Sequence, residues 1–222
     1  MKRHVLFTSF IVVMAAFALV FASAATGFAQ AKSPWQLRVR GLGVLPDDDS
    51  TSITTIGGNA TVDNSAGFEV DFTYFFIDNL AAELVLGVAQ HNVEAKGVNA
   101  AVVGASKVDL GDVWVIPPTL TLQYHFLPDE KFRPYIGAGV NYTIFTDPNK
   151  GVTVNDTDYD NSFGYALQAG ADIGLTEKFF LNFDLKKLYL ETDADVKALG
   201  TTVSTDVDID PWLVGAGIGY RF

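Results

Sequence analysis

The chain has 222 residues, enough for one domain of ordinary size. It contains no cysteine, which excludes a disulfide framework and any metal or nucleophile site built on thiolates. Its formal net charge of −11 makes it a poor candidate for binding nucleic acid.

Residues 1–31 have the three parts of a secretory signal peptide that is cleaved. Lys2 and Arg3 form a basic start, an apolar run extends from Val5 to Phe21, and Ala29-Gln30-Ala31 supplies the small residues that a signal peptidase requires. Ala22-Ser23-Ala24 also fits the cleavage rule, and the long apolar run leaves an uncleaved anchor as the alternative. Cleavage leaves 13 basic and 26 acidic residues, a net charge of −13. We expect residues 32–222 to form a single domain.

The remaining chain contains segments in which apolar and polar side chains alternate, the period of a β-strand. In Phe68–Phe76, the even-numbered residues are apolar, whereas Glu69, Asp71 and Thr73 occupy the other face. The alternation breaks at Lys187, which predicts either a bulge or a lysine that extends to the membrane interface. In chain order, the eight predicted strands are 35–40, 68–76, 82–88, 119–126, 133–144, 162–173, 179–186 and 212–222.

The connections between these strands alternate in length. Residues 77–79, 127–131 and 176–178 form short connections, whereas 46–64, 90–113, 146–161 and 193–206 are long. Short turns on one side and long loops on the other are typical of an all-β fold, the eight-stranded antiparallel transmembrane β-barrel with periplasmic turns and extracellular loops.

The polarity of the two faces favours this barrel over a soluble β-sandwich or lipocalin-like barrel. One face is aromatic and aliphatic, and the other is rich in glycine and carries most of the charge. A small soluble barrel would enclose the apolar face, but the narrow interior of eight strands suits glycine and paired polar groups better than so many bulky side chains. The bulky face is therefore predicted to contact lipid, with aromatic residues near both rims.

Several stretches carry a more specific pattern: Phe68–Phe75 followed by Asp78–Leu84, Pro117–Leu120 with Gln123–Phe126, Arg133–Thr143, Asp210–Trp212 and Gly219–Phe222. In this order they resemble the outer membrane protein W (OmpW) family over nearly all of the mature chain, and Arg133–Thr143 is the most distinctive part. Tyr220 and the terminal Phe222 also resemble the signal that outer-membrane barrels present to the barrel-assembly machinery.

The resemblance implies a monomeric outer-membrane barrel that passes small hydrophobic molecules through a narrow lumen, with lateral exit into the bilayer. Better-known members have an apolar constriction with an aromatic side chain from the seventh strand. The matching inward position here is Lys186, which is expected to face Val85 across the lumen.

The inward faces predict three groups of site residues. The first is a plug of opposite charges that pair across the lumen, which is also the ordinary way to satisfy buried charge. The second is an apolar lumen mouth, for which ordinary packing is the alternative, and the third is a set of prolines that weaken strand pairing at a lateral exit. The plug is Arg38, Arg40, Glu69, Asp71, Glu83, Arg133, Asp172, Asp184, Lys186 and Arg221; the mouth is Leu42, Val44, Val85, Leu188, Leu190 and Leu213; the exit is Pro117, Pro118 and Pro211.

Two rival functions remain open at this stage. An enzyme acting on lipids requires a serine–histidine arrangement at the outer leaflet, but His91 has no evident nucleophile or carboxylate beside it. A structural or adhesive barrel would contact lipopolysaccharide or host surfaces through its long loops. Besides lipid, lipopolysaccharide, the barrel-assembly machinery and hydrophobic solutes, no partner or cofactor is expected. Asp156-x-Asp158-x-Asp160 lacks the glycine and glutamate of a calcium loop, which leaves only loose divalent-cation binding beside lipopolysaccharide.

Overall fold

The computed structural model describes residues 33–47, 59–96, 107–145, 149–150, 156–159, 161–198, 201–208 and 210–222. The predicted signal peptide, residues 1–31, lies outside them. The strands are β1 (Trp35–Leu45), β2 (Asn59–Val62), β3 (Ser65–Ile77), β4 (Leu80–Lys96), β5 (Lys107–Ile116), β6 (Thr119–His125), β7 (Phe132–Phe145), β8 (Asn149–Lys150), β9 (Asp156–Tyr159), β10 (Ser162–Gly174), β11 (Phe179–Tyr189), β12 (Glu191–Ala198), β13 (Thr201–Asp208) and β14 (Trp212–Arg221).

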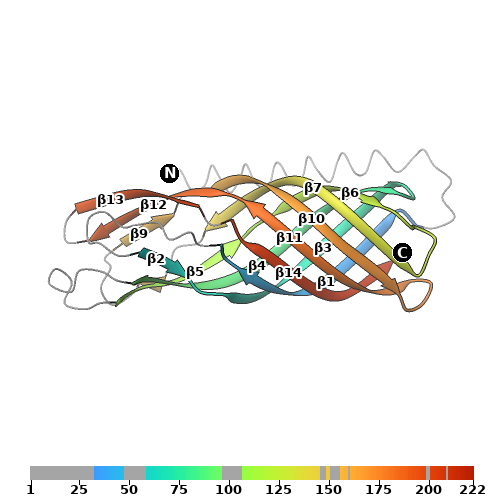
Figure 1. Cartoon of the computed structure of the whole chain (residues 1–222), viewed down its shortest axis with the longest axis horizontal. Coiled ribbons are helices and arrows are strands. Elements are labelled where there is room, and N and C mark those ends of the chain that lie inside the picture. The colour runs from blue at the N-terminus through green and yellow to red at the C-terminus, as the bar shows by residue number, and fades with distance from the viewer. Residues whose placement is uncertain are drawn as a thin grey trace.

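Eight strands close into an antiparallel barrel (Figure 1). The order around the barrel is β10, β11, β14, β1, β3, β4, β6 and β7, and the pairing of β7 with β10 closes the ring. β5 lies between β4 and β7, as β6 does, so β5 and β6 together form one barrel strand. The prediction of an eight-stranded barrel is confirmed.

The barrel encloses its charges and exposes its apolar side chains. Arg38 and Asp71 are 0% exposed, whereas Phe72, Leu122 and Ile218 are 46%, 54% and 57% exposed. Large apolar side chains on the outside are stable only where acyl chains cover them. Among the residues that the structure describes, none form a helix long and apolar enough to span a membrane.

The short turns and the C-terminus lie at one end of the barrel, which is the predicted periplasmic end (Figure 1). Aromatic rings contact one another around this rim: the ring centroids of Trp35 and Tyr74 are 4.8 Å apart, and those of Phe179 and Tyr220 are 5.0 Å apart. Tyr165 and Tyr189 stack at 5.2 Å near the opposite rim. These positions suit rings that meet lipid headgroups.

Strand pairing extends further than the sequence predicted. Parts of the connections expected as loops are strands: β4 continues to Lys96, β5 begins at Lys107, and β2 pairs with β4. β9, β12 and β13 form a separate three-stranded sheet beyond the barrel (Figure 1). Hydrogen bonding between backbones does not require a buried face, so pairing continues where the alternation used for prediction has ended.

Candidate functional site: the barrel lumen and its wall

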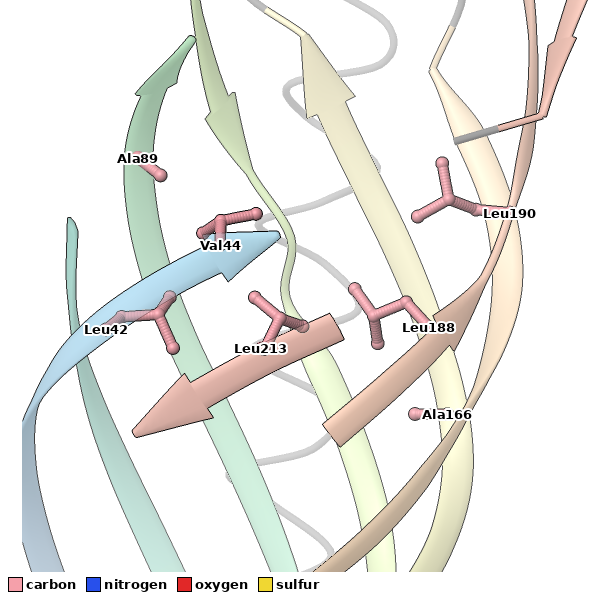
Figure 2. Packing of buried hydrophobic residues seen from close by; sticks show 7 residues of the cluster. All are labelled: Leu42, Val44, Ala89, Ala166, Leu188, Leu190 and Leu213. Carbon is pink, nitrogen blue, oxygen red and sulfur yellow. The ribbon is translucent and has the colours of Figure 1, made fainter. Parts of the chain in front are cut away.

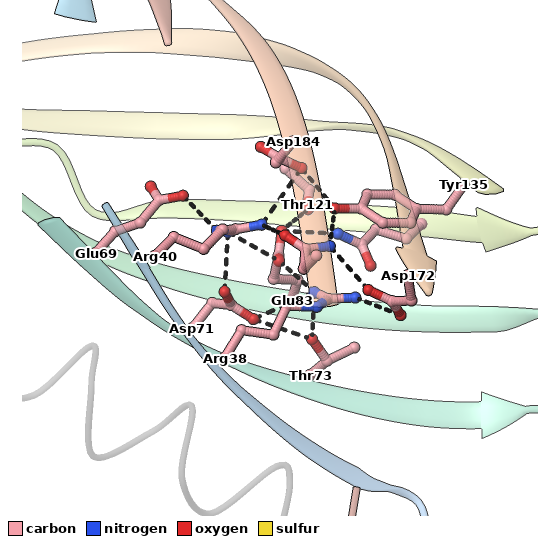
Figure 3. A network of polar contacts seen from close by, with 12 residues as sticks. Arg38, Arg40, Glu69, Asp71, Thr73, Glu83, Thr121, Tyr135, Asp172 and Asp184 are labelled. Carbon is pink, nitrogen blue, oxygen red and sulfur yellow. Dashed lines mark hydrogen bonds and ion pairs between the residues drawn. The ribbon is translucent and has the colours of Figure 1, made fainter. Parts of the chain in front are cut away.

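A network of charged and polar side chains fills the middle of the lumen (Figure 3). Neighbouring members of one strand are two residues apart, or four on β10, which places them on the same face. Every barrel strand except β14 contributes, because the inward positions of β14 at the level of the network are Gly215, Gly217 and Gly219. The charged members of this polar network are Arg38, Arg40, Glu69, Asp71, Glu83, Asp172, Asp184 and Lys186, and the neutral members are Thr73, Thr121, Gln123, Tyr135, Gln168 and Asn182.

Two arginines on β1 hold the network together. Arg38 Nη1 lies 2.7 Å from Glu83 Oε1 and 3.2 Å from Asp71 Oδ1. Arg40 lies 2.9 Å from Asp71 Oδ2 through Nη2 and 2.6 Å from Glu69 Oε1 through Nε. A planar guanidinium with several donors suits this crosslinking of carboxylates from different strands.

Glu83 is the centre of the network. Its Oε1 accepts from Arg38, and its Oε2 accepts from Gln123 Nε2 at 2.7 Å, Gln168 Nε2 at 2.8 Å and Thr121 Oγ1 at 3.3 Å. The donors come from β1, β6 and β10, so one carboxylate links strands across the lumen. Full satisfaction of this kind is what makes a buried charge tolerable.

Lys186 belongs to the polar network rather than to an apolar constriction. Its Nζ lies 3.0 Å from Glu69 Oε1 and 3.2 Å from Asp184 Oδ1. Val85 was predicted in the apolar mouth, but it is buried deeper, where it pairs across strands with Asp71 and Thr119. The reason is register: on β4, the inward residue at the level of the mouth is Ala89.

Arg133 and Arg221, which were predicted in the same plug, lie at the periplasmic ends of β7 and β14. The guanidinium of Arg221 lies 4.2 Å from the centroid of the Phe75 ring, and that of Arg133 lies 5.3 Å from the centroid of Phe180. Their polar contacts include the backbone carbonyls of Ser33 and Glu130. They are cation–π partners of an aromatic layer that the sequence analysis missed.

This layer, which we call the aromatic floor, consists of Phe75, His125, Tyr135 and Phe180. The ring of His125 lies 4.9 Å from Phe75 and 5.0 Å from Tyr135, and Arg38 lies over Tyr135 at 5.2 Å and Phe180 at 5.9 Å. Glycines make room for it: a Cβ on Gly219 would lie 2.0 Å from the Phe180 ring. The glycine-rich inner face of β14 was the available signal, because glycine in a strand often marks such a close approach.

Apolar side chains close the outer part of the lumen (Figure 2). Leu188 and Leu213 are 2% and 4% exposed, so these two side chains lie inside the barrel and not on its apolar outer surface. Ala89 and Ala166 were not predicted here, although their strand parity places them inward. The outer apolar cluster consists of Leu42, Val44, Ala89, Ala166, Leu188, Leu190 and Leu213.

The wall beside this cluster is interrupted between β4 and the strand formed by β5 and β6. β4 pairs with β6 up to Val85 and with β5 from Ala89, in one continuous register. Residues 86–88 of β4 have no partner in this described ladder, and the residues opposite them are Ile116, Pro117 and Pro118.

Pro117 is the residue that faces the interruption. Pro118 O accepts from Tyr142 N of β7 at 3.0 Å. Alternate residues of an antiparallel strand bond to opposite neighbours, so Pro117 faces β4. Pro117 has no N–H, and its carbonyl oxygen accepts from Thr119 Oγ1 at 2.9 Å. The wall is thus weakened toward β4 and remains paired toward β7.

Pro211, the other predicted exit, does not interrupt the wall. β11 and β14 pair up to Lys187 and Trp212, and Leu188 N then donates to Pro211 O at 3.1 Å. This regular pairing also rules out a bulge at Lys187. Instead, Lys187 Nζ extends to Asp47 Oδ2 at 2.8 Å, as a lysine near a membrane interface does.

A serine–histidine contact lies at the outer end of the lumen. Ser65 Oγ is 3.1 Å from His91 Nε2, and His91 Nδ1 is 3.4 Å from the backbone oxygen of Asp63. The expectation that His91 has no nucleophilic group beside it was therefore wrong; the pairing of β3 with β4 brings the two residues together. Asp156 and Asp158 lie on the extended strand β9 rather than in a calcium-loop turn, and Asp160 lies outside the described residues.

Comparisons with known proteins agree with this architecture. The model of the OmpW family matches residues 32–222. An uncharacterized outer-membrane protein, y4mB, of Sinorhizobium fredii is 46% identical over 90% of this chain and 85% of its own length, and outer membrane protein W of Vibrio cholerae is 31% identical over 90% and 94%. The crystal structure of OprG from Pseudomonas aeruginosa is 31% identical, covers 86% of this chain and 97% of its own, and has a TM-score of 0.76. The chain therefore belongs to the OmpW family of bacterial outer-membrane β-barrels.

Proposed function

We propose that the protein passes small hydrophobic molecules across the outer membrane and releases them sideways into the bilayer. The solute enters the outer apolar cluster from the extracellular side. The polar network and the aromatic floor block the straight path, and the solute leaves between β4 and the strand formed by β5 and β6. The proposal is one of transport, since OmpW-type barrels are not enzymes.

The observation that supports this route best is the adjacency of three features. Ala89 of the outer apolar cluster is the first residue of β4 to pair with β5 beyond the interruption. Gly87 lies within the interruption and has no side chain to fill the gap. It is next to Glu69 of the polar network: a Cβ placed on Gly87 would be 3.6 Å from the Cβ of Glu69. The gap in strand pairing therefore lies between the outer apolar cluster and the polar network.

The polar network itself makes the passage of an apolar solute unfavourable. Arg40, Glu69 and Lys186 form its outer surface, and their side chains are almost completely buried. An apolar molecule inserted among them would separate charges from their partners without replacing the contacts, which costs several kcal/mol. Lateral release into acyl chains avoids this cost.

The names of relatives give independent support. Two proteins that are 30% identical to this chain over 86% of its length are named dibenzothiophene metabolism operon proteins PahQ of Pseudomonas aeruginosa and DoxH of a Pseudomonas species. Dibenzothiophene is a fused, uncharged aromatic compound, which belongs to the solute class proposed here.

The test is the uptake of labelled dibenzothiophene by proteoliposomes and by cells, with and without the protein. We expect faster uptake with the protein, and slower uptake by Leu188→Gln, which places an amide in the outer apolar cluster. The matched control is Leu185→Gln, the same change on the lipid-facing side of the same strand, where Leu185 is 41% exposed.

Equal uptake with and without folded protein would overturn the proposal. It would favour the alternative of a structural or adhesive barrel, whose contacts with lipopolysaccharide or host surfaces involve the extracellular segments. Equal slowing by Leu188→Gln and Leu185→Gln would show that the route does not pass through the cluster.

A further inference from the structure

The pair Ser65–His91 borders the outer apolar cluster directly. Ser65 lies opposite Val44 in the pairing of β1 with β3. His91 is two residues beyond Ala89 on β4, so both point inward. Val113, which is 4% exposed, pairs with His91 on its other side. A polar pair is thus set into an otherwise apolar wall, at the place where a solute would enter.

The hydrogen bonds of His91 decide what Ser65 offers to a solute. The backbone oxygen of Asp63 can only accept, so Nδ1 of His91 carries the hydrogen of this 3.4 Å contact. A histidine with its ordinary pKa is mostly neutral at pH 7, and the neutral ring of His91 carries its only hydrogen on Nδ1. Its Nε2 then has a lone pair and no hydrogen.

The single hydroxyl hydrogen of Ser65 is therefore donated to His91 Nε2, across 3.1 Å. What remains on Ser65 Oγ are oxygen lone pairs, which accept hydrogen bonds and do not donate them. Ser65 is only partly buried. In this state it is an oriented acceptor at the edge of an apolar surface.

We propose that Ser65, oriented by His91, is a subsite that selects hydrophobic solutes carrying one hydrogen-bond donor, such as aryl or alkyl alcohols. The apolar part of the solute contacts the outer apolar cluster, and its hydroxyl donates to Ser65 Oγ. The inference rests on the proposed transport function and names the solute class for the same route.

One neutral hydrogen bond changes affinity by about two- to ten-fold. The chemistry gives each variant its own signature. Ser65→Ala removes the acceptor and should abolish the preference for donors, whereas Ser65→Thr keeps the hydroxyl and should retain it. His91→Phe keeps a ring but removes Nε2. It frees the hydrogen of Ser65, so the hydroxyl can donate as well as accept, and uptake of solutes that carry only an acceptor should rise relative to the wild type. A merely structural role of His91 predicts no such gain.

The experiment measures protein-dependent uptake of three probes by proteoliposomes, each corrected for flux through protein-free vesicles. Naphthalene carries no polar group, 1-naphthol carries a donor, and 1-methoxynaphthalene carries only an acceptor. The wild-type protein should favour 1-naphthol over 1-methoxynaphthalene about two- to ten-fold. Heat-dependent migration on SDS gels shows that each variant is folded. Thr143→Val, which removes another buried hydroxyl of the lumen, serves as the control and should keep the wild-type preference.

The possible failures are distinguishable. If the folded wild-type protein takes up all three probes with the same enhancement, or if Ser65→Ala keeps the preference, the subsite is refuted and the transport proposal stands. If no probe is enhanced, the transport proposal fails and the subsite fails with it.

Discussion

Individual residues in the lumen show how a narrow barrel tolerates many charges. Each carboxylate of the polar network meets at least one cation or amide donor, and Glu83 meets five donors from three strands at 2.7–3.4 Å. Burying ions is costly, and the cost is offset only by geometry of this quality. A change at the centre of the network therefore affects several strands at once.

Replacement of Glu83 by glutamine should destabilise the barrel by about 3 kcal/mol. The amide has one oxygen and one NH2 group, so it cannot accept from both the arginines and the three neutral donors. The measurement is unfolding in urea, followed by tryptophan fluorescence in lipid vesicles. Glu130→Gln, in an exposed periplasmic turn, is the control and should change stability by less than about 0.5 kcal/mol. Equal effects of the two changes would contradict a central role for Glu83.

At the scale of elements, the strand formed by β5 and β6 differs from the other strands of the wall. Two adjacent prolines interrupt its pairing on one side only, since Pro118 O still accepts from β7. Backbone pairing is what makes a transmembrane barrel impermeable from the side. Because the interruption is on one side only, we expect the wall to open between β4 and the strand formed by β5 and β6.

Pro117→Ala restores an N–H that faces β4, whereas Pro118→Ala restores one that faces β7. The first change should close the interruption, raise thermal stability and reduce dibenzothiophene uptake several-fold. The second change is the matched control and should leave uptake close to that of the wild type. Hydrogen exchange at residues 86–88 gives a second readout, because restored pairing slows exchange there. A larger loss of uptake in Pro118→Ala than in Pro117→Ala would assign the exit to the other side of the strand.

At the scale of the whole molecule, the fold depends on the membrane as its solvent. Val39 and Ile218 pair across β1 and β14 with more than half of each side chain exposed, while the neighbouring Arg38 is fully buried. In water this arrangement would expose a broad apolar band. In a bilayer the same band supplies the stabilising contacts.

An arginine placed on the outer surface should therefore lower the stability of the barrel, and the loss should depend on its depth in the bilayer. Val39 lies near the middle of β1, and Leu45 ends β1 opposite Trp212 at the outer rim. Val39→Arg should destabilise the barrel by about 2–4 kcal/mol, and Leu45→Arg by about 0–1 kcal/mol. Unfolding in lipid vesicles measures both. Equal costs at the two depths would contradict the placement of β1 across the bilayer.

The amino-acid sequence alone determined the class of the fold and its orientation. Period-two alternation assigns each side chain to a face without knowledge of its neighbours, and residues such as Phe72 and Asp71 differ too much in polarity to exchange faces. Strand count, the order of short and long connections and the inward position of Arg38, Arg40 and Glu83 follow from this pattern. The same parity was sufficient to place Leu188 and Leu213 inside.

Only the tertiary structure decided which inward residues meet. The height of a residue in the lumen depends on the register between neighbouring strands, which alternation does not specify. Register separates Val85 from the outer apolar cluster, brings Ser65 to His91, and places Arg133 and Arg221 on aromatic rings instead of carboxylates. The structure also decides which neighbouring strand Pro117 faces. A proline in the sequence shows that a backbone donor is missing, but it does not show on which side of the strand.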